Sequence, residues 1–292
     1  MTKIALIGPG AIGGTVGFAL AEKGRDLTIC ANQNFDTLAI TRADNKERRS
    51  QAVKVVTAPA EATPADWVLL CVKSHQTNSA AAWLKATVGP NTKLAVLQNG
   101  IEHRARVAPF VGSSNVVVPV IVILPAERTR PGEITLYGGA ALTVADDAAG
   151  RQFVELFSSS FIRVAADADF KTREWEKLCM NASSGAVTVL TGRADAIASS
   201  QELADLALRI IEECMAVGRA EGAKFSDGFA RAIIANFAKA GARGNSMFYD
   251  RRDGKKLEWD ARNGVVQRLG AKHGIATPVS DTVVPLLKAL SA

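Results

Sequence analysis

Short apolar runs alternate with more polar segments over the first half of the chain. Six such runs are separated by stretches long enough for helices or loops: "KIALIG", "LTICA", "VKVV", "WVLLCV", "KLAVLQ" and "NVVVPVIVI". Runs of valine, isoleucine and leucine in this arrangement are typical of a parallel sheet that is buried on both faces. The segment that follows, "GEITLYGGAALTVAD", predicts a hairpin that turns at Gly138 and Gly139.

The second half of the chain has longer, helical periodicities joined by short polar or glycine-bearing turns. Helices are predicted over residues 172–191, 201–221, 226–240, 256–273 and 279–290. The change of pattern falls at "RVAADADF", residues 163–170. We therefore expect an α/β domain over residues 1–166, followed by an all-helical domain over residues 167–292.

The helix predicted at the start of the second half carries an unusual polar stripe. At 100° per residue, one side is apolar, and the other contains Lys177, Asn181, Ser184, Gly185 and Thr188. A stripe with a charge only at one end is expected to face a partly enclosed cleft between the two domains. A lysine there suits proton transfer, because desolvation brings its proton affinity toward neutral pH.

A simpler interpretation of Lys177 is a salt bridge with Glu174 or Asp169 at the start of the helix. Periodicity alone does not separate this interpretation from a catalytic one. Gly185 weakens a helix, which suggests that another group approaches closely at that position.

A glycine-rich turn indicates what the α/β domain binds. In "KIALIGPGAIGG", Gly8, Gly10 and Gly13 follow a predicted strand and open a predicted helix. In that context the spacing indicates a Rossmann-type site, in which backbone N–H groups at a helix N-terminus bind a pyrophosphate. An ordinary strand-to-helix turn is the alternative. The residues expected to contact the cofactor in this turn are Gly8, Pro9, Gly10, Ala11, Ile12 and Gly13.

The end of the second strand bears on the choice of cofactor. The segment "LTICANQNF" has no acidic residue to bind the ribose 2′-hydroxyl of NAD, and it places Asn32 there instead. NADP is therefore the expected cofactor and NAD the less favoured one. Arg42, expected on a following helix, is either a ligand of the 2′-phosphate or a solvated surface charge. Polar residues that follow two later strands, Lys73 and Asn99, are expected at the ligand-binding edge of the sheet.

Composition excludes several other classes of function. The net charge is +6, but the basic residues are spread along the chain without the stripe or motif of a nucleic-acid-binding protein. Four cysteines stand far apart in apolar segments, which predicts reduced, buried thiols and no metal site. No signal peptide or membrane-spanning segment is recognisable, so we expect a cytoplasmic protein.

Six segments in this order resemble the ketopantoate reductase (2-dehydropantoate 2-reductase) family over residues 1 to about 280: "GPGAIGG", "CVKSHQT", "LQNGIEH", "EWEKLCMNASSG", "NSMFYDRRDGKKLEWDARNGVV" and "AKHGIATP". The resemblance implies a Rossmann domain followed by a helical domain, with the active site between them. It also implies NADPH-dependent reduction of 2-dehydropantoate to (R)-pantoate, a step of pantothenate biosynthesis.

The same resemblance implies roles for individual residues. Lys177 matches the general acid, Glu258 the glutamate that binds the substrate hydroxyl, and Asn181 the asparagine that orients lysine and substrate. Asn99 and Lys73 match residues near the nicotinamide and the substrate, and Ser246 matches a serine that binds the substrate carboxylate. From periodicity, Glu258 lies on a predicted helix, where a solvated surface glutamate is the alternative.

The chain departs from the family pattern in places that concern specificity. Gly185, counted among the expected substrate contacts, stands where the family often has a second asparagine, and "GARGNSM" precedes the serine. Asn32 stands where a basic residue is expected. A relative that reduces another small 2- or 3-keto acid is therefore the second hypothesis, and a non-catalytic NADP-binding sensor the third. A homodimer formed by the helical domain is a further expectation.

Overall fold

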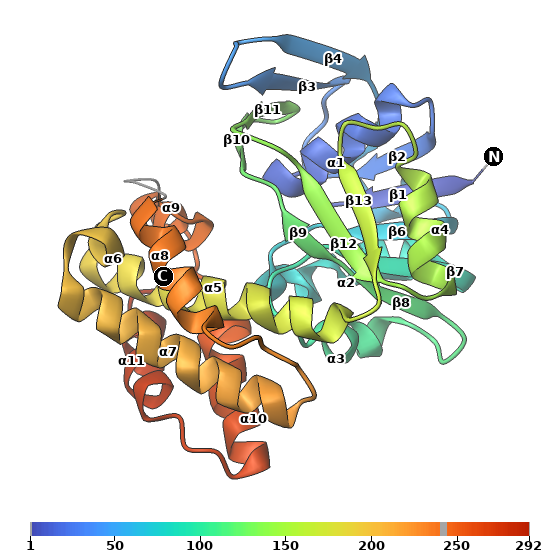
Figure 1. Cartoon of the computed structure of the whole chain (residues 1–292). Coiled ribbons are helices and arrows are strands. Elements are labelled where there is room, and N and C mark those ends of the chain that lie inside the picture. Colours follow the sequence, from blue (N-terminus) through green and yellow to red (C-terminus); the bar gives the residue numbers. More distant parts are fainter. Residues whose placement is uncertain (1, 240–243, 292) are drawn as a thin grey trace. The chain divides into compact units, whose positions relative to one another are not determined.

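The computed structural model describes residues 2–239 and 244–291, and its contacts divide the chain into two units (Figure 1). Unit 1 comprises Met1–Gln98 and His103–Phe170, and unit 2 comprises Asn99–Glu102 and Lys171–Ala292. The four residues Asn99–Glu102 therefore leave the first unit and pack with the second.

The central sheet of unit 1 is parallel throughout, which confirms the Rossmann-type fold expected from the apolar runs. The chain starts in the middle of this sheet and proceeds outward on each side in turn, so that β1 and β6 flank the point where the strand order reverses. In spatial order its strands are β5 (Lys54–Val56), β2 (Asp26–Cys30), β1 (Lys3–Ile7), β6 (Ala65–Leu70), β7 (Val88–Val96) and β8 (Val116–Pro119).

Four α-helices accompany these strands in the described part of unit 1. The first packs closely against its neighbours because glycines replace larger side chains on it: a Cβ at Gly17 would lie 3.1 Å from Leu38 Cδ1. The helices are α1 (Ala11–Glu22), α2 (Ala81–Thr87), α3 (His103–Val107) and α4 (Ala148–Leu156).

A second sheet of unit 1 was not predicted from the sequence. Its order is β10 (Ala126–Arg130), β11 (Glu133–Leu136), β3 (Thr37–Arg42) and β4 (Arg48–Ala52). The expected helix carrying Arg42 is wrong, since this residue ends strand β3. Leu38 and Ile40 on that strand are fully buried, and the sheet contacts α1. The apolar positions of this segment are therefore satisfied by a sheet.

The predicted hairpin is also wrong. Its two halves are real strands, but β11 pairs with β10 and β3, whereas β12 (Ala141–Ala145) pairs with β9 (Ile121–Ile123) and β13 (Arg163–Asp167) in a third sheet. The tight turn lies earlier, between β10 and β11, where Pro131 precedes Gly132. Gly132 adopts a φ of +77°, which a Pro–Gly turn accommodates at little cost.

Unit 2 contains helices and no strands among its described residues, as predicted. Its elements are α5 (Phe170–Thr191), α6 (Ala196–Ser199), α7 (Gln201–Ala220), α8 (Phe229–Lys239), α9 (Ser246–Arg252), η5 (Asp260–Gly264, a π-helical turn), α10 (Val265–His273) and α11 (Pro278–Ala289). Residue 240, the predicted end of one helix, and residues 241–243 of "GARGNSM" lie outside the described residues.

The apolar side predicted for the first of these helices is confirmed. Every member is at most 2% exposed and belongs to the core of unit 2: Trp175, Leu178, Cys179, Ala182, Ala186 and Val189. The four cysteines are free and buried, as expected, and burial raises the pKa of the Cys30 thiol to about 12. No helix among the described residues is long and apolar enough to cross a bilayer.

Candidate active site

The glycine turn of unit 1 is shaped by close backbone contacts. Gly8 has a φ of +89°, and a Cβ there would lie 2.5 Å from Val72 Cγ1. A Cβ at Gly13 would collide with the carbonyl oxygen of Gly8. Both positions therefore require glycine for reasons internal to the fold, the first for the turn and the second for the helix to pack beneath it.

Gly10 differs, because a Cβ there would meet no protein atom within 4 Å. It precedes α1, whose first turn has no capping side chain and no acidic residue, with Ala11 and Ile12 partly exposed. The helix N-terminus therefore has space in front of it and offers backbone N–H groups and a positive dipole end. These features fit the pyrophosphate of a dinucleotide. Pro9, between the glycines, is buried.

The candidates for cofactor discrimination lie at the surface of unit 1. Asn32 is exposed two residues after β2. Arg42 forms a two-point ion pair with Asp44, with Nε–Oδ1 and Nη2–Oδ2 distances of 3.1 and 2.5 Å. The guanidinium holds the pKa of the Asp44 carboxyl below its usual range. Arg42 would have to leave this carboxylate to bind a phosphate.

Lys73 also belongs to unit 1, where it follows β6 and leads into a short 3₁₀ turn, Ser74–Gln76. Its backbone N–H donates to Gln76 Oε1 at 3.2 Å, which fixes the start of this turn. The other residues expected to contact substrate all lie in unit 2.

Three of them form a chain of hydrogen bonds within unit 2. Asn99 Nδ2 donates to Glu258 Oε2 at 2.8 Å, and Asn181 Nδ2 donates to Asn99 Oδ1 at 3.2 Å. Glu258 is 2% exposed, so it is not the solvated surface glutamate of the alternative interpretation. It also lies just before a helix that begins at Trp259, so the prediction of helix from residue 256 is wrong. Segments distant in sequence thus join their side chains around one buried carboxylate.

Lys177 lies one helical turn before Asn181 and is partly buried. Neither hydrogen bond nor ion pair joins it to another described residue, and the salt bridge with Glu174 or Asp169 is not formed. Burial, with a smaller contribution from the positive charge of Arg262, lowers the pKa of Lys177 from its ordinary 10.5 to about 8. A group with this pKa can donate or accept a proton near neutral pH.

Sequence reasoning missed Arg262, which lies in the π-helical turn of η5 and is 1% exposed. Its Nη2 donates to Ser246 Oγ at 2.8 Å and lies 3.7 Å from Glu258 Oε2. The available signal was the spacing Glu-x-x-x-Arg, which places opposite charges one helical turn apart. π-Turns are rare and often occur at functional sites. Arg262 thus links the predicted serine to the predicted glutamate.

Gly185 is buried, and its close neighbours come from within unit 2. A Cβ at this position would lie 2.9 Å from Met247 Cε and 3.5 Å from Arg262 Nη1. Further along the same stripe, Thr188 Oγ1 accepts a hydrogen bond from Asn245 Nδ2 at 2.8 Å. The end of the stripe beyond Asn181 therefore packs against neighbouring elements of its own unit, and the group that approaches Gly185 is a side chain of this chain.

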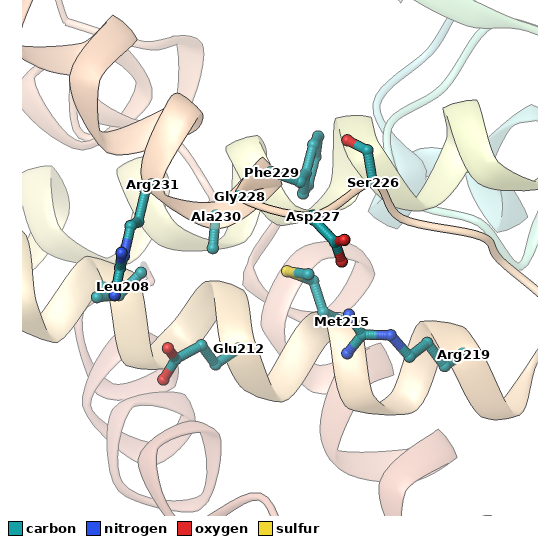
Figure 2. A pocket seen from close by; sticks show the side chains of 10 residues that line it. All are labelled: Leu208, Glu212, Met215, Arg219, Ser226, Asp227, Gly228, Phe229, Ala230 and Arg231. Atoms are coloured by element: carbon teal, nitrogen blue, oxygen red, sulfur yellow. The ribbon is translucent and has the colours of Figure 1, made fainter.

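A separate hollow of about 350 Å³ lies in unit 2 between α7 and the segment that leads into α8 (Figure 2). Its lining combines charges of both signs with apolar groups, among them Glu212, Arg219, Asp227 and Phe229. None of the predicted site residues lines it. Within the described ranges no group of three or more His, Cys, Asp or Glu side chains is arranged to bind a metal ion.

The chain matches known proteins over nearly its whole length. Residues 4–148 match the family model described as ketopantoate reductase PanE/ApbA, and residues 169–291 match the model of its C-terminal part. The chain is 41% identical to a 2-dehydropantoate 2-reductase of Caulobacter vibrioides, with 99% of each chain covered. It is 40% identical to one of Mycobacterium tuberculosis, with 99% of this chain and 98% of the relative covered.

A solved structure shares the same fold. The dimeric ketopantoate reductase of Staphylococcus aureus superposes with a TM-score of 0.86 at 25% sequence identity, covering 99% of this chain and 98% of that one. Two family models, full-length relatives and this likeness of structure all agree, and the chain belongs to the ketopantoate reductase family.

Proposed function

We propose that this chain reduces 2-dehydropantoate to (R)-pantoate with NADPH. Its 40–41% identical relatives are named 2-dehydropantoate 2-reductase, which supports the substrate and the reaction. The observation that carries the proposal is the cluster in unit 2. A lysine whose pKa is lowered to about 8 lies one turn from Asn181, which is hydrogen-bonded through Asn99 to the buried Glu258.

In this reaction Lys177 is the general acid. NADPH, when bound, supplies the hydride that the keto carbon receives. Lys177 donates its proton to the carbonyl oxygen, which becomes the hydroxyl of the product, and it regains a proton from water. Near pH 7 a lysine with a pKa of about 8 is mostly protonated yet releases its proton far more readily than a solvated lysine.

Glu258 accepts a hydrogen bond from the substrate hydroxyl, and Asn99 holds the carboxylate for that task. Asn181 aligns Asn99 with Lys177, since it lies on the same face of α5 as the lysine. Ser246, an exposed residue of unit 2, binds the substrate carboxylate through its hydroxyl.

The glycine turn and the start of α1 would bind the pyrophosphate of the cofactor. NADPH is favoured over NADH because Asn32 replaces the acidic residue that binds the 2′-hydroxyl of NAD. Arg42 would bind the 2′-phosphate by exchanging its Asp44 partner for the phosphate. The dimeric relative from S. aureus supports a homodimer, which light scattering of the purified protein tests. Cytoplasmic location stays a prediction from the sequence.

Steady-state reduction of 2-dehydropantoate, with NADPH and NADH side by side, tests the proposal. We expect turnover with a clear preference for NADPH, and a kcat at least ~10² lower in Lys177→Ala. Turnover of other short 2- or 3-keto acids but not of 2-dehydropantoate would favour the second candidate, a different keto-acid substrate. The observation that favours this second candidate is Gly185, which is buried beside Arg262 at a position where the family often has an asparagine. Cofactor binding without reduction of any keto acid would refute both and favour a sensor.

A further inference from the structure

The guanidinium of Arg262 is buried with two of its donor groups unused. Nε and Nη1 are inaccessible and have no hydrogen-bond partner among the described residues, while Nη2 bonds Ser246 Oγ. Leaving donors of a buried cation unpaired costs free energy. Such a group in a folded protein calls for an explanation, and a role in the site is one.

The hydrogen bond to Ser246 fixes the direction of the serine hydroxyl. A guanidinium can only donate, so Ser246 Oγ is the acceptor and its own proton must point to another group. Arg262 lies behind Ser246, since the arginine is 1% exposed and the serine is exposed. The serine hydroxyl is thus prepared to donate to an acceptor such as a carboxylate.

The positive charge of Arg262 acts on two residues of the proposed reaction centre, Glu258 and Lys177. Its Nη2 lies 3.7 Å from the Glu258 carboxylate, and its positive charge is one cause of the lowered pKa of Lys177. Asp250, which is 8% exposed on α9, is the second acidic side chain that stabilises the guanidinium.

Several other charged groups on the elements that carry this cluster are paired with each other or bonded elsewhere, and Lys171 of α5 is exposed. Arg173 and Glu176 pair on α5 at 2.8 Å, and Glu102 and Asp260 both pair with Arg268 at 2.6 and 2.5 Å. Glu174, also on α5, is 8% exposed and has a partner of its own. Among the described residues of unit 2, Arg262 is thus the cation that acts on Lys177.

Gly185 lies beside the guanidinium of Arg262. A Cβ at Gly185 would lie 2.9 Å from Met247 Cε and 3.5 Å from Arg262 Nη1, the latter an ordinary van der Waals distance. The residue that departs from the family pattern and the buried arginine are therefore direct neighbours.

We infer that Arg262 is a positioning residue of the keto-acid reductase site, which orients the Ser246 hydroxyl toward the substrate carboxylate and supplies a buried positive charge beside Glu258. The inference rests on the proposed function for its substrate. Its electrostatic part concerns the protein alone, so that it can be measured without turnover.

Two substitutions separate charge from hydrogen bonding. Arg262→Met removes the cation, so the alkaline limb of kcat/KM for reduction should move to higher pH as Lys177 holds its proton more firmly. KM for the keto acid should rise roughly 10- to 100-fold, the loss expected for one charge-assisted hydrogen bond. Arg262→Lys keeps the positive charge but not the guanidinium geometry, so the limb should stay nearer to that of the wild type while KM still rises.

Arg209→Met, which removes an exposed arginine of α7, is the matched control and should change neither quantity. If Arg262→Met only lowers the melting temperature while the pH limb and KM of the folded protein are unchanged, the arginine is structural and the inference is overturned. Gly185→Asn should lower kcat/KM more in the wild type than in Arg262→Met, because the new asparagine lies beside the guanidinium only in the wild type. Equal effects in both backgrounds would refute the link.

A readout independent of activity separates this inference from the proposed function. Carbon-13 labelling of lysine side chains, with Lys177→Met to assign the resonance, gives the pKa of Lys177 by NMR titration. We expect a higher pKa in Arg262→Met than in the wild type, and an unchanged pKa refutes the electrostatic role. Failure of the wild type to reduce 2-dehydropantoate would refute the proposed function and leave the titration result valid.

Discussion

Replacing Lys177 by methionine should stabilise the protein while it abolishes catalysis. Burial makes the charged form of Lys177 unfavourable in the folded state, where its pKa is about 8 against an ordinary 10.5. At about 1.4 kcal/mol per pKa unit, this shift corresponds to about 3 kcal/mol of lost stability at pH 7. Methionine keeps most of the aliphatic chain and carries no charge, so it removes that cost.

Proton linkage gives the sign and the pH range of this stability difference. Below pH 8 the folded and the unfolded protein both carry the proton on Lys177, so the full loss of stability is present. Between pH 8 and 10.5 the unfolded chain still binds the proton and the folded protein does not, so wild-type stability rises with pH and the cost disappears. The advantage of Lys177→Met should thus fall from about 3 kcal/mol at pH 7 to about 2 kcal/mol at pH 9.

Urea unfolding at pH 7 and pH 9, followed by circular dichroism, measures this difference, and kcat is measured on the same preparations. Lys171→Met, at an exposed position of the same helix, is the matched control and should change neither stability nor kcat appreciably. If Lys177→Met is less stable than the wild type at pH 7, or if its stability advantage does not decline at pH 9, burial does not lower the pKa of Lys177. A variant with near-wild-type turnover would refute its role as general acid.

Three more outcomes are expected. Because reduction requires the protonated form of Lys177, kcat/KM at saturating NADPH should fall about tenfold per pH unit above pH 8, while the reverse oxidation, which requires the neutral form, should rise up to about pH 8 and then level off; parallel profiles in the two directions would contradict this. Gly10→Ala should leave the melting temperature unchanged but weaken NADPH binding at least about tenfold, whereas Gly13→Ala, whose methyl group collides with backbone, should lower the melting temperature as well. Arg42→Ala should raise KM for NADPH and leave KM for NADH unchanged, and equal KM values in wild type and variant would mean that Asp44 retains the arginine.

The periodicity of single segments predicted much of the fold. The apolar side of α5 was read from its spacing, because a helix places every third or fourth residue on one face whatever packs against it. The parallel strands were found for a similar reason, since runs buried on both faces need no alternation. The strand that ends at Arg42 and the partner of β11 were not found, because strand pairing joins segments far apart in sequence.

The candidate site was predicted from the sequence in part by periodicity and in part by family resemblance. Lys177 and Asn181 followed from a polar stripe on an apolar helix, whereas Asn99, Glu258 and Ser246 depended on family resemblance. Arg262 was missed because a charged residue within an apolar segment is usually placed at the surface, and only burial beside Glu258 and Ser246 shows otherwise.

The sequence by itself determined the class of the fold, the glycine turn before α1 and the place of Lys177 on α5, because each is encoded by local spacing. The tertiary structure decided the partners: Asn99 bonded to Glu258, Arg262 behind Ser246, and Arg262 with Met247 filling the space at Gly185. It also decided the chemistry of Lys177, since a pKa near 8 depends on which groups surround the amine and exclude water. Burial and charge contacts arise between distant segments, and no local pattern contains them.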